Sequence, residues 1–382
     1  MISLQRLTVD GFLSLHEVDV TFGDLNVLVG PNGAGKTNLL RAIQFLGDVV
    51  RHDLEGALES SGNFDRLLFA GDVEPRPTRF RFQTWAQSAE GETYYGLLVS
   101  ETKSGLRRTE RLKLKRREKV VGKFDAREGI VRGSSASVDV NQPIQPFSAA
   151  ISTLPRLKLD DWIGELAEFF ETIRVFEPDP VLTGFASRIE KSPVLDDEAR
   201  NLAPYLFWLS EADPEAFKLL QRDLRYVLPG FESLSFEQIG GSVRSVEVMF
   251  KESGMLEPLP LGDASLGTLR GLAILALLHD PNPPALTCVD EIDYGLHPYA
   301  LDIVVERMRS ASERTQLIVS THSPSLVNRL RPSELIVCER DDETGASIIP
   351  AIDPKEVAGM AEDSGLRLGE LWFSGALGGV PE

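Results

Sequence analysis

The sequence predicts an α/β fold in which helices pack on a largely parallel sheet, and three observations lead to that prediction. A short apolar run, LNVLV, stops at Gly30, and a helical pattern begins at Lys36. From about residue 231, strand-like and helical patterns alternate, which is typical of a parallel sheet with helices on it. Residues 79–124 carry successive strand-like runs and predict a mixed sheet in the first lobe.

The N-terminal elements follow from the spacing of apolar residues. Residues 2–29 predict three strands, the last of them buried. The next helix is predicted because Leu39, Leu40, Ile43 and Leu46 recur at steps of three and four residues. Residues 125–155 carry few periodic signals and contain Gly, Ser, Gln and Pro, so we expect a connection there.

Residues 157–228 are predicted to be helical, with helices at 159–173, 195–209 and 214–228; the first has Trp162, Leu166, Phe169 and Ile173 on one face. The last part predicts helices at 265–279 and 298–310 and strands at 231–236, 243–250, 285–290, 315–320 and 334–339. We therefore expect an N-terminal lobe at 1–155, a helical insertion lobe at 156–230 and a C-terminal lobe at 231–382.

Composition narrows the class of protein. The chain has 382 residues and a net charge of −18, and no apolar run approaches the roughly 18 residues of a membrane span. The start lacks the pattern of a signal peptide. Cys288 and Cys338 lie in apolar strand-like runs and match no metal spacing, which favours reduced thiols and a cytoplasmic location. The acidic balance argues against indiscriminate binding to nucleic acid or membranes, but it allows a local basic patch.

A phosphate-binding loop is the strongest motif. Its glycines let backbone N–H groups turn inward around a phosphate, and the following helix adds its positive end. The lysine can reach the β- and γ-phosphates, and the threonine hydroxyl can ligate Mg²⁺. The alternative, a glycine-rich turn with a solvated lysine, lacks the strand before and the helix after the loop. The motif consists of Gly30, Pro31, Asn32, Gly33, Ala34, Gly35, Lys36 and Thr37.

An acidic pair closes the apolar strand ALTCV. Asp290 stands where a carboxylate can hold the Mg²⁺ shell, and Glu291 follows it, where a general base can orient and deprotonate water. An apolar strand ending in Asp-Glu is common and is often only a solvated strand end. Beside a phosphate-binding loop we interpret it as catalytic.

Two further candidate sites are identified by their positions relative to the acidic pair. His322 ends the next strand, LIVS, and is predicted to contact the γ-phosphate, although a lone histidine is more often structural. Ser265 and Gly267 open an apolar helix, and such a helix start can bind phosphate. Every helix needs a cap, so this signal depends on its place before Asp290.

The four motifs, in this order, resemble the ABC-type ATPases of the RecF and structural-maintenance-of-chromosomes (SMC) class. GPNGAGKT looks like Walker A, TCVDEID like Walker B with its catalytic glutamate, SLGTLR like the signature and VSTHSP like the H-loop; Asp293 lies in the D-loop region. The resemblance covers most of the chain and is closest to stand-alone bacterial predicted ATPases of the AAA type, without coiled coil or fused nuclease. It implies a P-loop NTPase fold like an SMC head.

Some positions depart from that class. Leu266 stands where the signature usually has an acidic residue, and Leu13 stands where the N-terminal Gly-Phe-x-Ser turn usually has a basic one. The Q-loop glutamine is not fixed by the pattern. Gln142 and Gln145 are candidates, with surface glutamines as the alternative.

The resemblance implies a mechanism and partners. ATP and Mg²⁺ would be the cofactors, with Lys36, Glu291 and His322 catalytic. Two copies would clamp two ATP molecules head to head, with Ser265 and Gly267 of one copy facing the ATP of the other. Hydrolysis would open the clamp.

The substrate of the clamp is open at this point. Residues 101–124 hold ten Lys or Arg against three Glu. They can contact DNA in repair or genome maintenance, form a solvated ribbon, or dock an acidic protein. The alternative function is a regulatory or anti-phage defence ATPase that controls a separate effector protein, since no second catalytic cluster is visible. A transporter subunit fits poorly, because Ser265 lies 229 positions after Lys36 in the sequence.

Overall fold

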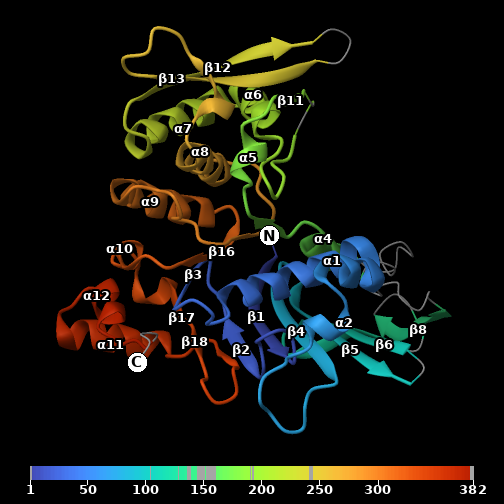
Figure 1. Cartoon of the computed structure of the whole chain (residues 1–382). Coiled ribbons are helices and arrows are strands. Elements are labelled where there is room, and N and C mark those ends of the chain that lie inside the picture. The colour runs from blue at the N-terminus through green and yellow to red at the C-terminus, as the bar shows by residue number, and fades with distance from the viewer. Residues whose placement is uncertain are drawn as a thin grey trace.

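A parallel sheet buried on both faces forms the centre of the structure (Figure 1). The computed structural model describes residues 2–103, 105–127, 129–135, 139–143, 151, 161–189, 191, 193–240 and 244–378. Every strand pair of this sheet is parallel. In four of its five strands every residue is buried, which explains why the sequences of these strands are largely apolar runs. Its order is β10 (Arg174–Phe176), β15 (Leu286–Val289), β16 (Gln316–Thr321), β3 (Leu25–Val29) and β17 (Leu335–Val337).

Helices cover both faces of the central sheet. Helix α1 (Lys36–Ser61) belongs to the hydrophobic core on one side, and α8 (Leu266–Leu278) and α9 (Leu301–Ser312) belong to the core on the other. Leu28 and Val29, neighbours on β3, contribute to different cores because side chains alternate along a strand. The predicted α/β class is confirmed.

An antiparallel sheet of eight strands packs on α1 and on α4 (Asp161–Glu171). Its last two strands occupy residues for which the sequence predicted a connection, and that prediction was wrong. IVRGSS and DVNQP lack a regular apolar alternation, yet their backbones continue the ladder. The order is β2 (Val18–Thr21), β1 (Ser3–Asp10), β4 (Arg79–Ser88), β5 (Gly91–Thr102), β6 (Gly105–Arg116), β7 (Lys119–Arg127), β8 (Ile130–Ser135) and β9 (Asp139–Pro143).

The basic segment 101–124 is part of this sheet and not a separate ribbon. Strand β6 lies between β5 and β7, so it is not an edge strand. Its side chains alternate between the core and the opposite face. Arg108 points into the core, where its Nε lies 2.7 Å from an oxygen of the fully buried Glu110. Arg108 is therefore not a surface charge, whereas Arg107, Lys113 and Lys115 lie on the other face.

The remaining elements surround α8 and the C-terminal strands. Helices α6 (Leu202–Ala212) and α7 (Pro214–Val227) pack on an antiparallel sheet of β11 (Ser187–Arg188), β12 (Phe231–Ile239), β13 (Ser245–Glu252) and β14 (Leu259–Pro260). Short helices are α2 (Phe64–Leu67), α5 (Pro180–Thr183) and α10 (Pro324–Val327). After β18 (Glu339–Arg340) and β19 (Ser347–Ile348), the described chain closes with α11 (Pro354–Ser364) and α12 (Leu368–Phe373).

The helices predicted between 157 and 228 are present, although the second begins at Leu202 and not at 195. They do not share one packing partner, because α4 lies in the core of α1 while α6 and α7 lie in that of α8. The three-lobe division of the chain stays a prediction. Within the described ranges, no helix is both long and apolar enough to cross a membrane.

Candidate nucleotide site

The loop between β3 and α1 has a backbone that only glycine accommodates at two positions. Gly30 and Gly35 have φ values of 156° and 96°. A Cβ atom at Gly30 would lie 2.1 Å from the carbonyl oxygen of Cys338, and one at Gly35 would lie 1.9 Å from Ser347 Oγ. The loop therefore passes tightly between two C-terminal segments, which fixes its curvature.

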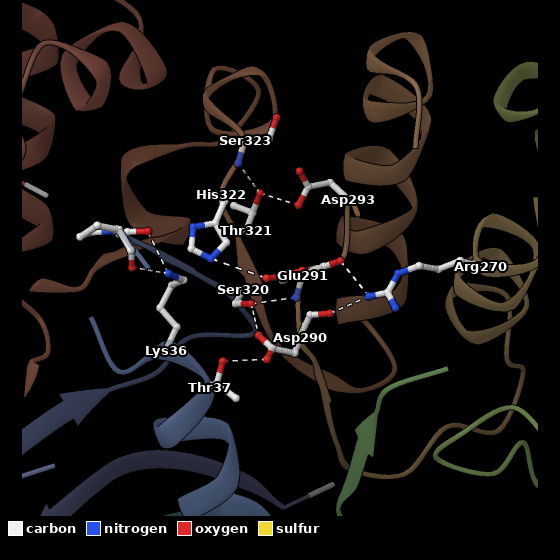
Figure 2. A network of polar contacts seen from close by, with 12 residues as sticks. Lys36, Thr37, Arg270, Asp290, Glu291, Asp293, Ser320, Thr321, His322 and Ser323 are labelled. Carbon is white, nitrogen blue, oxygen red and sulfur yellow. Dashed lines mark hydrogen bonds and ion pairs between the residues drawn. The ribbon is translucent and has the colours of Figure 1, made fainter. Parts of the chain in front are cut away.

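Lys36 points back into the loop that precedes it (Figure 2). Its side chain is buried, and Nζ donates hydrogen bonds to the carbonyl oxygens of Gly30 at 2.8 Å and Pro31 at 2.9 Å. Burial lowers the pKa of Lys36, while the charges of Asp290 and Glu291 oppose that effect. The ammonium group is thus held at the mouth of a ring of backbone groups, where phosphate oxygens can replace the two carbonyls as its partners.

Asp290, which follows β15, forms a hydrogen bond with Thr37 at the start of α1. Thr37 Oγ1 donates to Asp290 Oδ2 at 2.8 Å, and the buried Ser320 hydroxyl on β16 donates to the other carboxylate oxygen. A hydroxyl and a carboxylate oxygen converge here, and both are the hard oxygen donors that Mg²⁺ prefers. The chemistry of this pair fits a magnesium ion.

Hydrogen bonds hold the backbone of Glu291, while its side chain is partly exposed. Its φ is +49°, an uncommon value for a residue with a side chain. Its N–H donates to Ser320 Oγ at 2.8 Å, and Arg270 Nη2 donates to the carbonyl oxygens of Asp290 and Glu291, both at 3.0 Å. The Glu291 side chain is 45% exposed and lies 3.8 Å from His322 Nε2.

His322 follows β16 and lies beside Glu291. Burial, and after it the positive charge of Lys36, lower the pKa of His322, so the neutral imidazole dominates at pH 7. Thr321 Oγ1 donates to Asp293 Oδ1 at 2.6 Å and accepts from the Ser323 N–H at 3.0 Å. These bonds connect the turn that carries His322 to the turn after Glu291 (Figure 2).

A cavity of about 520 Å³ lies beside this cluster, although Asp290 itself does not line it. Its walls include most of the phosphate-binding loop, from Asn32 to Thr37, together with Leu13, Glu291 and His322. Arg66 and Arg340 also line it. Sequence reasoning missed both arginines, since neither carries a local motif and 273 residues lie between them. It also missed the role of Ser320 and of Arg270, although Arg270 stands within the SLGTLR motif.

The signature residues Ser265 and Gly267 lie at the start of α8 and not around this cavity. Ser265 caps α8 by accepting from the Thr268 N–H at 3.1 Å, and Gly267 lies against the carbonyl of Gly295. Neither residue lines the cavity around Lys36 in its own chain.

The Q-loop candidates stay predictions. Gln142 lies in β9, but its side chain is not among the described ones, and Gln145 lies outside the described residues. No group of three or more His, Cys, Asp or Glu side chains that could hold a metal was found in the described ranges.

A phosphate-binding loop after β3, an acidic pair after β15 and a histidine after the neighbouring β16 define an ATPase of the ABC type, in the class that includes SMC heads, RecF and OLD nucleases. The family can also be stated. A family model matches residues 25–328, and the chain belongs to that family, described as "AAA domain, putative AbiEii toxin, Type IV TA system".

Individual relatives agree with this assignment. The chain is 36% identical over 101 residues to an OLD nuclease of Thermus scotoductus, a match that covers 23% of this chain and 19% of the relative. It is 50% identical over 46 residues to the DNA replication and repair protein RecF of Psychromonas ingrahamii, covering 12% and 13%. These matches span less than a fifth of either relative.

The fold comparison covers nearly the whole chain. An SMC head bound to the C-terminal winged-helix domain of ScpA matches 93% of this chain and 99% of its own, with a TM-score of 0.62 at 18% identity. This match supports the predicted SMC-head-like fold.

Proposed function

We propose that this chain is a Mg²⁺-dependent ATPase whose two copies close head to head around two ATP molecules, and that this cycle acts on DNA. One observation carries the proposal. The cavity around Lys36 is lined by groups for phosphate, metal and water, among them Thr37 and Glu291, whereas Ser265 and Gly267 at the start of α8 do not line it. A second copy would supply the missing wall.

Within one chain, different residues bind phosphate, hold the metal and activate water. Lys36 and the backbone N–H groups of the loop bind phosphate oxygens. Thr37 and Asp290 would hold Mg²⁺, which when bound neutralises phosphate charge. Glu291 accepts a proton from a water molecule and orients it, and the neutral His322 can donate a hydrogen bond to the terminal phosphate.

Exposed apolar side chains around the site support closure against a second copy. Tyr294 and Phe373 are 65% and 78% exposed and line a cavity of about 690 Å³ that also includes Glu291 and His322. Leu266, in the signature, is 61% exposed. Its apolar side chain, where the class usually has an acidic one, suits such a surface.

Glu291→Gln tests the clamp. The amide keeps the shape of the side chain but does not accept the proton of water, so the variant is expected to accumulate as a dimer with ATP and Mg²⁺. Light scattering after gel filtration measures this, with Lys36→Ala as the control that stays monomeric. A Glu291→Gln protein that remains monomeric at saturating ATP would contradict the clamp.

A mixing experiment tests whether Ser265 acts on the ATP of the other copy. Lys36→Ala and Ser265→Arg are each expected to lose turnover alone. Mixed together, they form dimers in which one site has an intact Lys36 and an intact Ser265 from different copies. Turnover is therefore expected to reappear on mixing, and its absence would place Ser265 outside the site.

DNA is tested by turnover with and without DNA, again with Lys36→Ala as the blank. Stimulation that fades with salt supports a DNA-linked cycle. Turnover that is indifferent to DNA supports the alternative, a regulator of a separate effector protein.

A further inference from the structure

The outer face of the eight-stranded sheet carries a row of basic and aromatic side chains. Strand register places Arg6 beside Trp85, Trp85 beside Tyr94, Tyr94 beside Lys113 and Lys113 beside Lys123. These residues alternate with buried neighbours, so the row lies on the face opposite α1 and α4.

Contacts between neighbours hold the row in place. The Arg6 guanidinium lies 4.8 Å from the centroid of the Trp85 ring, and Lys113 Nζ lies 5.1 Å from that of Tyr94. The two rings meet edge to face, with centroids 5.3 Å apart. Gln83 Nε2 donates to the Tyr94 hydroxyl at 2.9 Å, which fixes the second ring.

This face carries mainly positive side chains, whereas the chain as a whole has a negative net charge. Arg81, Arg107, Arg111, Arg127 and Arg132 flank the row on β4, β6, β7 and β8. Acidic neighbours compensate only in part: Asp19 pairs with Arg6, Asp125 with Arg111 and Lys123, and Glu92 with Lys115. A positive surface in a protein of net charge −18 indicates a polyanionic partner.

We infer that this sheet face binds single-stranded nucleic acid. This inference rests on the proposed action on DNA and names the form of nucleic acid that the face fits. Unpaired bases can stack on Tyr94 and Trp85, or on the guanidinium plane of Arg6, and sequence-tolerant stacking of this kind requires bases outside a duplex. Lys113 and Lys123, in line with the rings, then face the phosphates.

The test measures fluorescence anisotropy of a labelled 20-nucleotide oligo(dT) with the full chain and without ATP. Trp85→Ala and Tyr94→Ala are each expected to weaken binding roughly tenfold. Lys113→Gln and Lys123→Gln are each expected to reduce the slope of log affinity against log salt by about 0.7. Lys218→Gln, an exposed lysine on α7, is the matched control and leaves both quantities unchanged.

Competitors and a second variant keep the outcomes distinct. A duplex of equal length should compete at least tenfold more weakly than oligo(dT), and oligo(U) separates RNA from DNA. Lys36→Ala should retain binding, so failure of the ATP clamp does not remove this signal. Unchanged affinity in both ring variants, shown folded by thermal unfolding, would overturn the inference. Equal competition by duplex would also overturn it.

Discussion

Replacing Arg270 with alanine removes the connection between the signature helix and the backbone that carries Glu291. The Arg270 side chain reaches from α8 to two successive carbonyls, both at 3.0 Å, and its guanidinium lies 5.4 Å from the centroid of the Tyr294 ring. Arg270 does not line the cavity around Lys36. It is therefore a positioning residue, and its loss is expected to lower kcat with little change in KM for ATP.

The size of the effect follows from the contacts. A hydrogen bond from a charged donor contributes about 1.5–3 kcal/mol, and a single nitrogen makes both bonds, so we take about 2–3 kcal/mol for the pair. Glu291 has a left-handed backbone that costs about 1–2 kcal/mol and needs such support. At 1.36 kcal/mol per tenfold in rate, a loss of this size lowers kcat by about 30-fold to 160-fold.

Steady-state kinetics of ATP turnover measures this effect, and urea unfolding measures the stability of the variant. Arg314→Ala is the matched control, because Arg314 likewise donates to two backbone carbonyls, that of Leu278 at the other end of α8 and that of Ser310 on α9. Both variants should lose similar stability, and only Arg270→Ala should lose kcat. A kcat within twofold of the parent would refute the positioning role, and so would an equal loss in Arg314→Ala.

Three further expectations concern the loop, a buried thiol and the cavity. Gly30→Ala places a Cβ atom 2.1 Å from the Cys338 carbonyl, so titration calorimetry should show at least a tenfold loss of ATP affinity; Gly23→Ala, with open space around it, should show none. Burial raises the pKa of Cys338 to about 12. Above pH ~8.5 this thiol therefore ionises only in the unfolded chain, and the free energy of unfolding falls by about 1.4 kcal/mol per pH unit. The unfolding free energy of the parent should therefore drop about 2 kcal/mol more than that of Cys338→Ala between pH 8 and 10, and equal drops would contradict the burial. Arg340→Ala should raise the Kd for ATP roughly three- to tenfold without a change in urea midpoint, and Arg340→Lys should restore part of the affinity; an unaltered Kd would remove Arg340 from the site.

The sequence was informative where local pattern and tertiary structure agree. The run LNVLV, the glycine-rich loop and the helix after it could be located because each has a strong local signature. The meeting of Glu291 with His322 could also be expected, since parallel neighbouring strands bring their carboxyl ends to one edge.

Elements without a local signature could not be found in this way. Strand β10 has three residues within a helical stretch and is recognisable only by its pairing with β15. Strands β8 and β9 gain their order from the ladder rather than from apolar side chains. Arg66 and Arg340 are far apart in the sequence, and only the folded chain brings them to the same cavity.

The position of β3 also determines when the protein can acquire its function during synthesis. This strand comes from the first thirty residues, yet both of its neighbours, β16 and β17, come from residues after 315. A ribosome must therefore deliver residues 316–337 before the strand ahead of the P-loop has both of its partners. Such distant pairing costs loop-closure entropy and slows folding. Nascent chains should thus remain unable to bind nucleotide until β17 has left the exit tunnel, and their apolar β3 is a natural target for chaperones.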